Sequence, residues 1–339
     1  MKRLTYDEIA QITRGAAYME EVGRKVSFHR FTKEQEELYF QMRNQFYIAA
    51  QYSAGVKLEF QTDSTRIYLK ADVWTGSDNR LFFSFDVYEN GAYVDSMDNF
   101  SERELEQNYT EDKYRTGVYE KEFYFGEGMK TICVHLPYSM ETKLCQLSVD
   151  DGAKVLPVQR KKKLVAYGDS ITHGYDALHP SKRYISKFAE YLEAEEFNKA
   201  IGGETFFPEL ALTKEDFEPD YVVVAYGTND WSHETRETFV ENCRAFYHNI
   251  NSTYPKARIF AITPIWRKDY MVKKAFGPFQ EVIDEMRFAT EGLDNVEVIP
   301  GIELVPHDET YYADLRLHPR DEGFEHYFEN LKKYVEDRQ

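Results

Sequence analysis

Apolar and polar residues alternate with a period of two along most of the first 150 positions. The alternation is clearest at 56–60, 67–73 and 83–87, and it places apolar side chains on one face of an extended strand. The last of these runs leads into Asn90-Gly91, a pair typical of a type I′ hairpin turn. The pattern predicts an antiparallel, all-β sandwich, jelly-roll-like in form. Further short runs of the same kind lie at 119–125, 131–136 and 143–149.

The pattern changes near residue 155. Short, continuous apolar runs at 164–167, 221–226 and 258–262 are typical of buried parallel strands. Helical apolar stripes alternate with them, which predicts a three-layer α/β/α sandwich with right-handed crossovers. We therefore expect an N-terminal β-sandwich domain at 1–155 and an α/β/α domain at 156–339. Weaker strand candidates lie at 197–201 and 296–299, and the helical stripes lie at 184–192, 239–250 and 324–335.

The charge and cysteine content exclude several classes of function. The 339-residue chain carries a formal net charge of −17, which disfavours nucleic acid and anionic membranes as partners. None of the three cysteines forms a CxxC pair or a zinc-type cluster with histidine, so we expect no metal site. The first thirty residues contain no apolar segment of the signal-peptide type, so we expect a cytoplasmic location. The oligomeric state stays open.

The segment 167–174, with the sequence YGDSITHG, is the first candidate for chemistry. Ser170 lies in a Gly-Asp-Ser turn directly after a predicted strand, and open α/β sheets bind ligands at such strand ends. A serine nucleophile needs a base and an oxyanion hole. The alternative interpretation is a serine that caps the following helix.

Two later segments offer oxyanion donors. Gly203 follows a short strand in NKAIGGET, and a glycine there allows its backbone N–H to approach a ligand closely. Asn229 follows the strand at 221–226 in YGTNDW, where its side-chain amide can donate a second hydrogen bond. Alternatively, these segments are a plain glycine loop and an Asx turn that closes a strand.

A fourth segment, DLRLHP at 314–319, offers the base. His318 can take the serine proton and later return it, and Asp314 can orient the imidazole. A single histidine before a helix is also compatible with a surface or capping role. The order of the four segments along the chain favours the catalytic interpretation.

Ser170, Gly203, Asn229 and His318, in this order on an α/β domain, resemble the SGNH (GDSL-type) hydrolase family. The resemblance covers roughly residues 160–337 and implies a flavodoxin-like α/β/α fold. It further implies that Ser170 is the nucleophile and His318 the base. The oxyanion hole would consist of the Ser170 N–H, the Gly203 N–H and the Asn229 amide. The implied chemistry requires no metal and no organic cofactor.

The chain departs from this family at one position. The family usually places its aspartate three residues before the histidine, but Leu315 stands there and Asp314 lies four residues before His318. A small bulge would restore the contact. Otherwise the site is a Ser-His dyad in which a backbone carbonyl or another group orients the imidazole. Asp308 and Asp321 are further candidates for the missing carboxylate.

A β-sandwich followed by an SGNH domain resembles the layout of carbohydrate esterase family 2 and related acetyl esterases. This resemblance implies removal of O-acetyl groups from sugars or oligosaccharides through an acetyl-serine. Trp231, Trp266 and Arg267 follow strand ends and are candidate substrate-binding residues, with core packing as the alternative for the two indoles. Lysophospholipase or acyl-thioesterase activity and a non-catalytic carbohydrate-binding protein are the rival functions.

Overall fold

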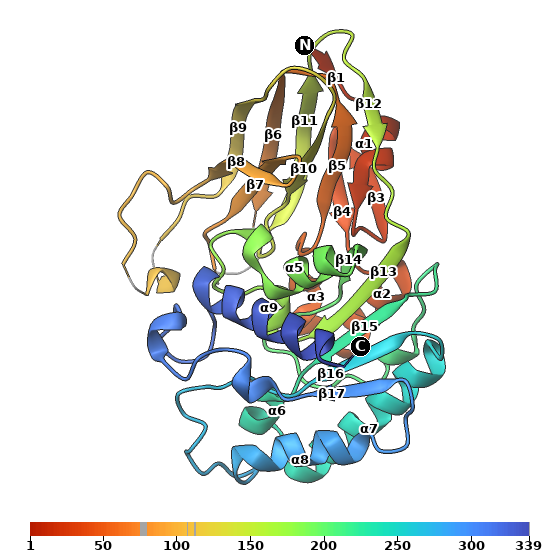
Figure 1. The fold of residues 1–339 in the computed structure, drawn as a ribbon, viewed down its shortest axis with the longest axis vertical. Coiled ribbons are helices and arrows are strands. Elements are labelled where there is room, and N and C mark those ends of the chain that lie inside the picture. Colours follow the sequence, from red (N-terminus) through yellow and green to blue (C-terminus); the bar gives the residue numbers. More distant parts are fainter. Residues whose placement is uncertain (75–79, 107, 112, 339) are drawn as a thin grey trace.

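Two antiparallel sheets and one parallel sheet build the described part of the molecule. The computed structural model describes residues 1–74, 80–106, 108–111 and 113–338. Figure 1 shows the antiparallel sheets stacked in the upper part of the molecule and the parallel sheet with its helices in the lower part. The first antiparallel sheet contains β1 (Lys2–Arg3), β3 (Tyr18–Val22), β4 (Lys25–His29), β6 (Arg66–Trp74), β9 (Gly117–Tyr124) and β11 (Glu141–Val149). The second contains β2 (Thr13–Arg14), β5 (Lys57–Thr62), β7 (Ser84–Glu89), β8 (Ala92–Asp98), β10 (Lys130–His135) and β12 (Val155–Pro157).

Alternating side chains form the core between these two sheets. The sheet orders are β3-β4-β11-β6-β9 and β12-β5-β10-β7-β8, with β1 paired to β11 and β2 to β5. Leu69 of β6 and Phe60 of β5 are fully buried in one apolar cluster with Val134 of β10. Asn90 and Gly91 join β7 to β8 with φ of 50° and 81°, as a type I′ turn requires. The alternation thus predicts these antiparallel strands correctly, while the jelly-roll-like connectivity stays a prediction.

Helices also occur in the N-terminal half, which is therefore not all-β. They are α1 (Tyr6–Ile12), α2 (Lys33–Met42) and α3 (Asn44–Ala50). A capping box between Thr32 and Gln35 begins α2. This helix start signal is present in the sequence, but the surrounding residues have the period-two pattern of strands. Tyr39 of α2 is fully buried in the apolar cluster of the C-terminal half. The division at residue 155 stays a prediction, because α2 packs across it and β12 extends beyond it.

The C-terminal half contains a parallel five-stranded sheet of order β14-β13-β15-β16-β17. The order is 2-1-3-4-5 along the chain, the flavodoxin-like arrangement, and it confirms the predicted α/β fold. Its strands are β13 (Lys162–Gly168), β14 (Ala194–Asn198), β15 (Tyr221–Ala225), β16 (Arg258–Ile262) and β17 (Val296–Ile299). Its helices are α4 (Ser170–His173), α5 (Tyr184–Tyr191), α6 (Thr228–His233), α7 (Arg236–Thr253), α8 (Phe279–Ala289) and α9 (Asp321–Glu336). Single 3₁₀ turns lie at Tyr109–Glu111, Pro180–Lys182, Leu210–Leu212, Gly301–Glu303 and Glu309–Tyr311.

The two faces of this sheet are covered by different helices. In β13, Leu164 and Ala166 face the cluster that contains α5 and α9, whereas Val165 and Tyr167 face the cluster that contains α7 and α8. In Figure 1, α5 and α9 lie above β16 and β17, on the side towards the sandwich, whereas α7 and α8 lie below them. The strand order reverses direction between β13 and β15, and their carboxyl ends are the expected place for a ligand. Among the described residues, no helix has the length and apolarity needed to cross a membrane.

Candidate active site

Ser170 begins α4 directly after β13 and is nearly buried, with 4% of its surface exposed. Asp169 caps this short helix by accepting a hydrogen bond from the Ile171 amide at 3.0 Å, and burial raises the pKa of Asp169 to about 7. A Cβ at Gly168 would lie 2.6 Å from Thr172 Oγ1 and 2.9 Å from the Ala225 carbonyl oxygen. The turn therefore requires glycine before Asp-Ser, and it holds the serine at the edge of the sheet.

The Ser170 hydroxyl donates to His318 Nε2 at 2.8 Å. The other ring nitrogen, Nδ1, lies 2.8 Å from Asp314 Oδ2. The second oxygen, Asp314 Oδ1, accepts from the backbone amides of Arg316, Leu317 and His318 at 2.9, 2.7 and 3.1 Å. The structure thus brings together the three side chains that the sequence proposes for a triad.

A left-handed residue produces the unusual spacing of four between Asp314 and His318. Leu315 has φ of 54°, and the Ala313 amide donates to the His318 carbonyl at 2.9 Å, so the intervening residues form a closed loop. The geometry corresponds to the bulge rather than to the dyad. The alternative carboxylates lie elsewhere: Asp308 caps the turn at 309–311, and Asp321 accepts from the Leu178 amide.

The hydrogen bonds within this loop lower the pKa of the Asp314 carboxyl. Burial raises the pKa of its carboxyl, but the His318 hydrogen bond, the imidazole charge and the amides of Leu317 and His318 outweigh burial. The net result is a pKa of Asp314 well below its ordinary value. The carboxylate is therefore ionised when it meets His318.

Gly203 follows β14 and Asn229 follows β15, the two strands that flank β13 in the parallel sheet. Asn229 Nδ2 donates to the Glu204 carbonyl at 3.0 Å. A side-chain amide has two hydrogens, so one remains for a ligand. Gly203 is exposed with φ of 86°, a conformation that favours glycine. Across the open side of Gly203, the Phe46 ring of α3 lies 3.6 Å from where a Cβ would be.

Buried polar side chains hold these two donor segments in place. His173 Nδ1 accepts from the Gly202 amide at 3.2 Å, and its Nε2 donates to the Tyr138 carbonyl at 2.9 Å. Burial, with the charges of Arg30 and Arg183, keeps the pKa of His173 well below its ordinary value. The imidazole is therefore neutral, and it ties the glycine loop to the β10–β11 connection of the N-terminal half.

Glu204 anchors the same loop on its other side. Its carboxyl is fully buried and accepts from the Tyr39 hydroxyl at 2.9 Å, while Arg43 Nη1 lies 3.8 Å away. Burial raises the pKa of Glu204 to about 8, against the opposing effects of Arg43 and Tyr39. The loop that carries Gly203 thus depends on α2, an element of the N-terminal half.

The predicted substrate-binding side chains are packed into the protein. Trp231 is 1% exposed, its Nε1 donates to the Gly277 carbonyl at 2.9 Å, and Lys274 Nζ lies 3.8 Å from a ring centroid. The expectation that Trp231 binds substrate is therefore wrong, because its side chain is buried. Trp231 instead packs in the apolar core, which is the alternative that the sequence leaves open.

Trp266 and Arg267 are also buried. Trp266 is 7% exposed and stacks on His307, so it offers little surface to a substrate. Arg267 is 2% exposed, pairs with Asp269 at 2.6 Å and donates from Nη1 to the Thr228 carbonyl at 3.0 Å. We correct its assignment accordingly: Arg267 supports the turn that carries Asn229 from behind.

Two residues that sequence reasoning missed lie at the centre of the site. Asp176 is fully buried, with Oδ2 3.7 Å from His318 Nδ1, and Arg80 pairs with Asp176 at 2.7 Å. Asp176, Asp314 and His318 each bring a possible metal-binding atom within 4.8 Å of the others. However, the Arg80 guanidinium already supplies a positive charge there, which opposes a second cation.

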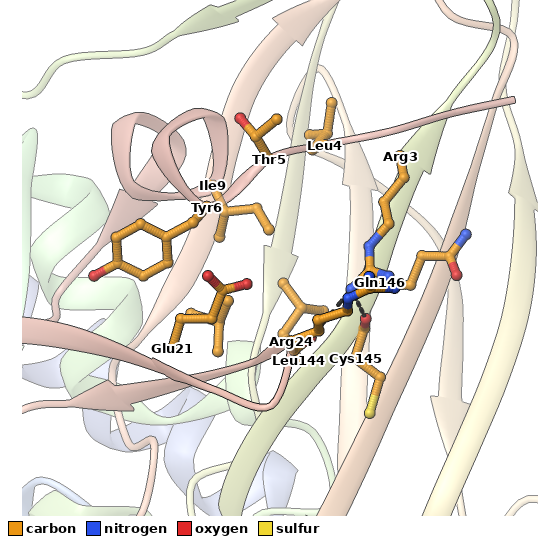
Figure 2. A pocket seen from close by; sticks show the side chains of 11 residues that line it. Arg3, Leu4, Thr5, Tyr6, Ile9, Glu21, Arg24, Leu144, Cys145 and Gln146 are labelled. Atoms are coloured by element: carbon orange, nitrogen blue, oxygen red, sulfur yellow. Dashed lines mark hydrogen bonds between the residues drawn. The ribbon is translucent and has the colours of Figure 1, made fainter.

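The cavity shown in Figure 2 is remote from this chemistry. It has a volume of about 380 Å³ and lies where α1, β4 and β11 meet. Figure 2 shows the Arg3 guanidinium reaching across it to the carbonyls of Arg24 and Cys145, at 3.1 and 2.6 Å. None of its lining residues belongs to the Ser170 site.

Comparison with known proteins agrees with this geometry. The model of the GDSL-like lipase/acylhydrolase family matches residues 166–326, whereas no curated protein sequence matches the chain. A salicylyl-acyltransferase from a tetracycline biosynthetic pathway is similar in structure, with 18% identity and a TM-score of 0.78 over 96% of this chain and 94% of that chain. A protein described as a GDSL-like lipase from Bacteroides ovatus has 18% identity and a TM-score of 0.77 over 99% and 97%.

A family two carbohydrate esterase from Clostridium thermocellum, solved with cellohexaose, has 16% identity and a TM-score of 0.62. The match covers 85% of this chain and 93% of that chain, so the similarity in fold includes the N-terminal sheets. Residues 166–326 therefore match the GDSL-like lipase/acylhydrolase family, the chain is a hydrolase of ester bonds, and its fold is similar to that of the family two carbohydrate esterase.

Proposed function

We propose that this protein is a serine esterase that removes O-acetyl or other short acyl groups from sugars or oligosaccharides through an acyl-Ser170 intermediate. The observation that carries the proposal is the continuous hydrogen-bonded chain from Ser170 Oγ through His318 to Asp314, with both distances at 2.8 Å. A hydroxyl, a base and an orienting carboxylate in this geometry form the arrangement that activates serine.

In the first step, Ser170 Oγ attacks the ester carbonyl carbon while its proton moves to His318 Nε2. The carbonyl oxygen becomes an oxyanion, which accepts hydrogen bonds from the Ser170 amide, the Gly203 amide and the free hydrogen of Asn229 Nδ2. Because Ser170 is the first residue of α4, its amide has no partner within the helix. Collapse of the intermediate transfers the proton from His318 to the leaving sugar oxygen and leaves an acyl-serine.

In the second step, water replaces the sugar. His318 takes a proton from the water as it attacks the acyl carbon, and the same donors stabilise the second oxyanion. The proton then passes from His318 to Ser170 Oγ as the carboxylic acid leaves. Throughout, Asp314 holds the Nδ1–H of the imidazole, so that Nε2 is free to accept a proton.

The proposed substrate class has two supports. The fold of 85% of the chain is similar to that of the family two carbohydrate esterase, and a formal net charge of −17 favours a neutral substrate over a polyanion. Lysophospholipase and acyl-thioesterase activities use the same catalytic groups, and they differ in requiring space for a long acyl chain. Carbohydrate binding without catalysis does not require a hydrogen bond between a serine hydroxyl and a histidine, so the Ser170–His318 contact favours the esterase.

Three measurements test the proposal. A fluorophosphonate probe should label the wild-type protein, and Ser170→Ala should abolish both the labelling and ester hydrolysis. Ser252→Ala, which removes an exposed hydroxyl on α7, is the matched control and should behave like wild type. Hydrolysis by Ser170→Ala within tenfold of the wild-type rate would refute the nucleophile.

Substrate class requires separate assays. A series of p-nitrophenyl esters should show the highest kcat/KM for acetate and a steep fall for octanoate and longer chains. A panel of acetylated oligosaccharides, with acetate release as readout, should identify the sugar. A preference for long acyl chains would instead indicate a lipase or thioesterase.

A further inference from the structure

A second carboxylate faces the catalytic histidine. The Asp176 side chain is fully buried, and its Oδ2 lies 3.7 Å from His318 Nδ1, beside the 2.8 Å contact of the same nitrogen with Asp314 Oδ2. Asp314 accepts the hydrogen bond of this nitrogen, whereas Asp176 lies beyond hydrogen-bond distance and acts on the ring through its charge. Together they would also stabilise the imidazolium, because opposite charges within about 4–6 Å favour the charged form of a group.

Arg80 offsets this excess of negative charge. Its Nε lies 2.7 Å from Asp176 Oδ1 and its Nη2 lies 3.3 Å from Asp176 Oδ2, an arrangement that engages both carboxylate oxygens. The same Nη2 lies 3.3 Å from His318 Nδ1. Because the guanidinium is positive, its closeness to the ring directly opposes the formation of an imidazolium.

The N-terminal half holds both members of this pair. Arg80 lies in the connection between β6 and β7, and its carbonyl accepts from the Ser139 hydroxyl at 3.2 Å. The Asp176 amide donates to the Tyr138 hydroxyl at 3.1 Å, and the Asp176 carbonyl accepts from the Tyr109 hydroxyl. Asp176 itself has φ of 75°, a left-handed conformation that these contacts maintain. Three connections of the sandwich therefore reach the segment after α4.

The surroundings of His318 define its charge balance. Of the residues that the structure describes, those that face the ring are Ser170 with its hydroxyl, Asp314 and Asp176 with their carboxylates, Arg80 with its guanidinium and, at 6.0 Å between centroids, Tyr175 with its ring. The Arg80 guanidinium also lies over Tyr175, 4.7 Å from its centroid. Among the described residues, Arg80 balances the charge of Asp176, and the charge of Asp314 remains opposite Nδ1.

We infer that Arg80, supplied by the N-terminal half, is a positioning residue that neutralises Asp176, so that His318 Nδ1–H donates its hydrogen bond to Asp314 alone and a second carboxylate does not stabilise the imidazolium. This inference rests on the proposed roles of Ser170, His318 and Asp314. It assigns the N-terminal half a part in catalysis itself, in addition to any part in substrate binding.

The test is the pH profile of kcat/KM for p-nitrophenyl acetate. In Arg80→Gln, the imidazolium is no longer opposed by a cation, so the acid limb should move to higher pH by about one unit or more. Along the acid limb, a shift of one unit lowers kcat/KM about tenfold. In Asp176→Asn, Arg80 loses its counter-charge beside the ring, so the acid limb should move to lower pH.

Two further variants separate charge from structure. The double variant Arg80→Gln/Asp176→Asn restores the charge balance and should return the acid limb towards its wild-type position. Arg80→Lys retains the positive charge and should keep the acid limb near wild type, although it loses the two-pronged contact. Arg160→Gln removes another part-buried arginine, which pairs with Glu59 and Glu190 away from the site, and should leave the profile unchanged.

Two results would overturn the inference. One is an unchanged acid limb in Arg80→Gln with kcat within threefold of wild type. The other is reduced activity in Arg80→Gln with an unshifted limb and no recovery in the double variant, which would indicate a merely structural role. Failure of the proposed function has a different signature, because Ser170→Ala would then retain hydrolysis whatever Arg80 does.

Discussion

Replacement of Asp314 by asparagine tests the orienting carboxylate with little change of shape. The new Oδ1 can still accept from the amides of Arg316, Leu317 and His318, as the aspartate oxygen does at 2.7–3.1 Å. The new Nδ2 would replace the oxygen that faces His318 Nδ1 at 2.8 Å. Two N–H donors cannot share this contact, so the imidazole is driven to the tautomer with its proton on Nε2, which cannot accept the serine proton.

The size of the effect follows from the geometry. In a serine protease the equivalent change lowers kcat by about 10⁴, or about 5.5 kcal/mol in the activation free energy. Here Asp176 lies 3.7 Å from Nδ1, beyond hydrogen-bond distance, and is held by Arg80. Because the Asp176 carboxylate can replace part of the effect of Asp314 on the imidazole, we expect kcat to fall by a factor of about 10²–10⁴. Because the three amide contacts remain, the melting temperature should fall by only a few degrees.

The assay measures kcat, KM and melting temperature on p-nitrophenyl acetate at pH 7.5. Asp308→Asn is the matched control, because Asp308 also caps a short turn by accepting from Thr310 but lies apart from His318. It should retain wild-type kcat. A kcat of Asp314→Asn within tenfold of wild type, with the fold intact, would refute the role of Asp314 and favour a dyad with another orienting group.

Three further predictions concern the base, the oxyanion hole and a buried acid. His318→Ala should remove most ester hydrolysis across pH 5–9, because no other described side chain lies within hydrogen-bond distance of Ser170 Oγ; rates near wild type at any pH would contradict this. Asn229→Ala should lower kcat about 10²–10³-fold with little change in KM, because its amide acts on charge that develops in the transition state; an effect on KM alone would show that Asn229 only positions substrate. Glu204 has a folded pKa of about 8, raised by burial, so the folded state retains a proton that the unfolded chain releases above about pH 4.3, and wild-type stability should fall as the pH rises towards 8. Glu204→Gln removes this dependence, so the stability of the variant relative to wild type should increase from pH 5 to pH 8 by up to about 4 kcal/mol. Melting curves of the two proteins that stay parallel across this pH range would disprove the assignment.

The sequence by itself determined the elements and the approximate place of the site. Period-two alternation predicts β5, β6, β7 and β10, and short apolar runs predict β13, β15 and β16, because one or two buried faces impose these patterns locally. The segments around Ser170 and Asn229 follow strands of one parallel sheet, so their meeting at its carboxyl edge is predictable from topology alone. His318 contacts Ser170, and the loop of Gly203 contacts Asn229 through the Glu204 carbonyl.

Only the tertiary structure decided how that site is completed. Whether Asp314 reaches His318 depends on the left-handed Leu315, a conformation that leucine rarely adopts and that the closed loop enforces. Trp231 and Trp266 have the same sequence signature whether they face substrate or core, and packing places both inside. Arg80 and Asp176 are 96 residues apart in the chain. Their pairing depends on how the sandwich docks against the α/β part, because residue patterns report local periodicity, whereas a contact between distant segments follows from the path of the whole chain.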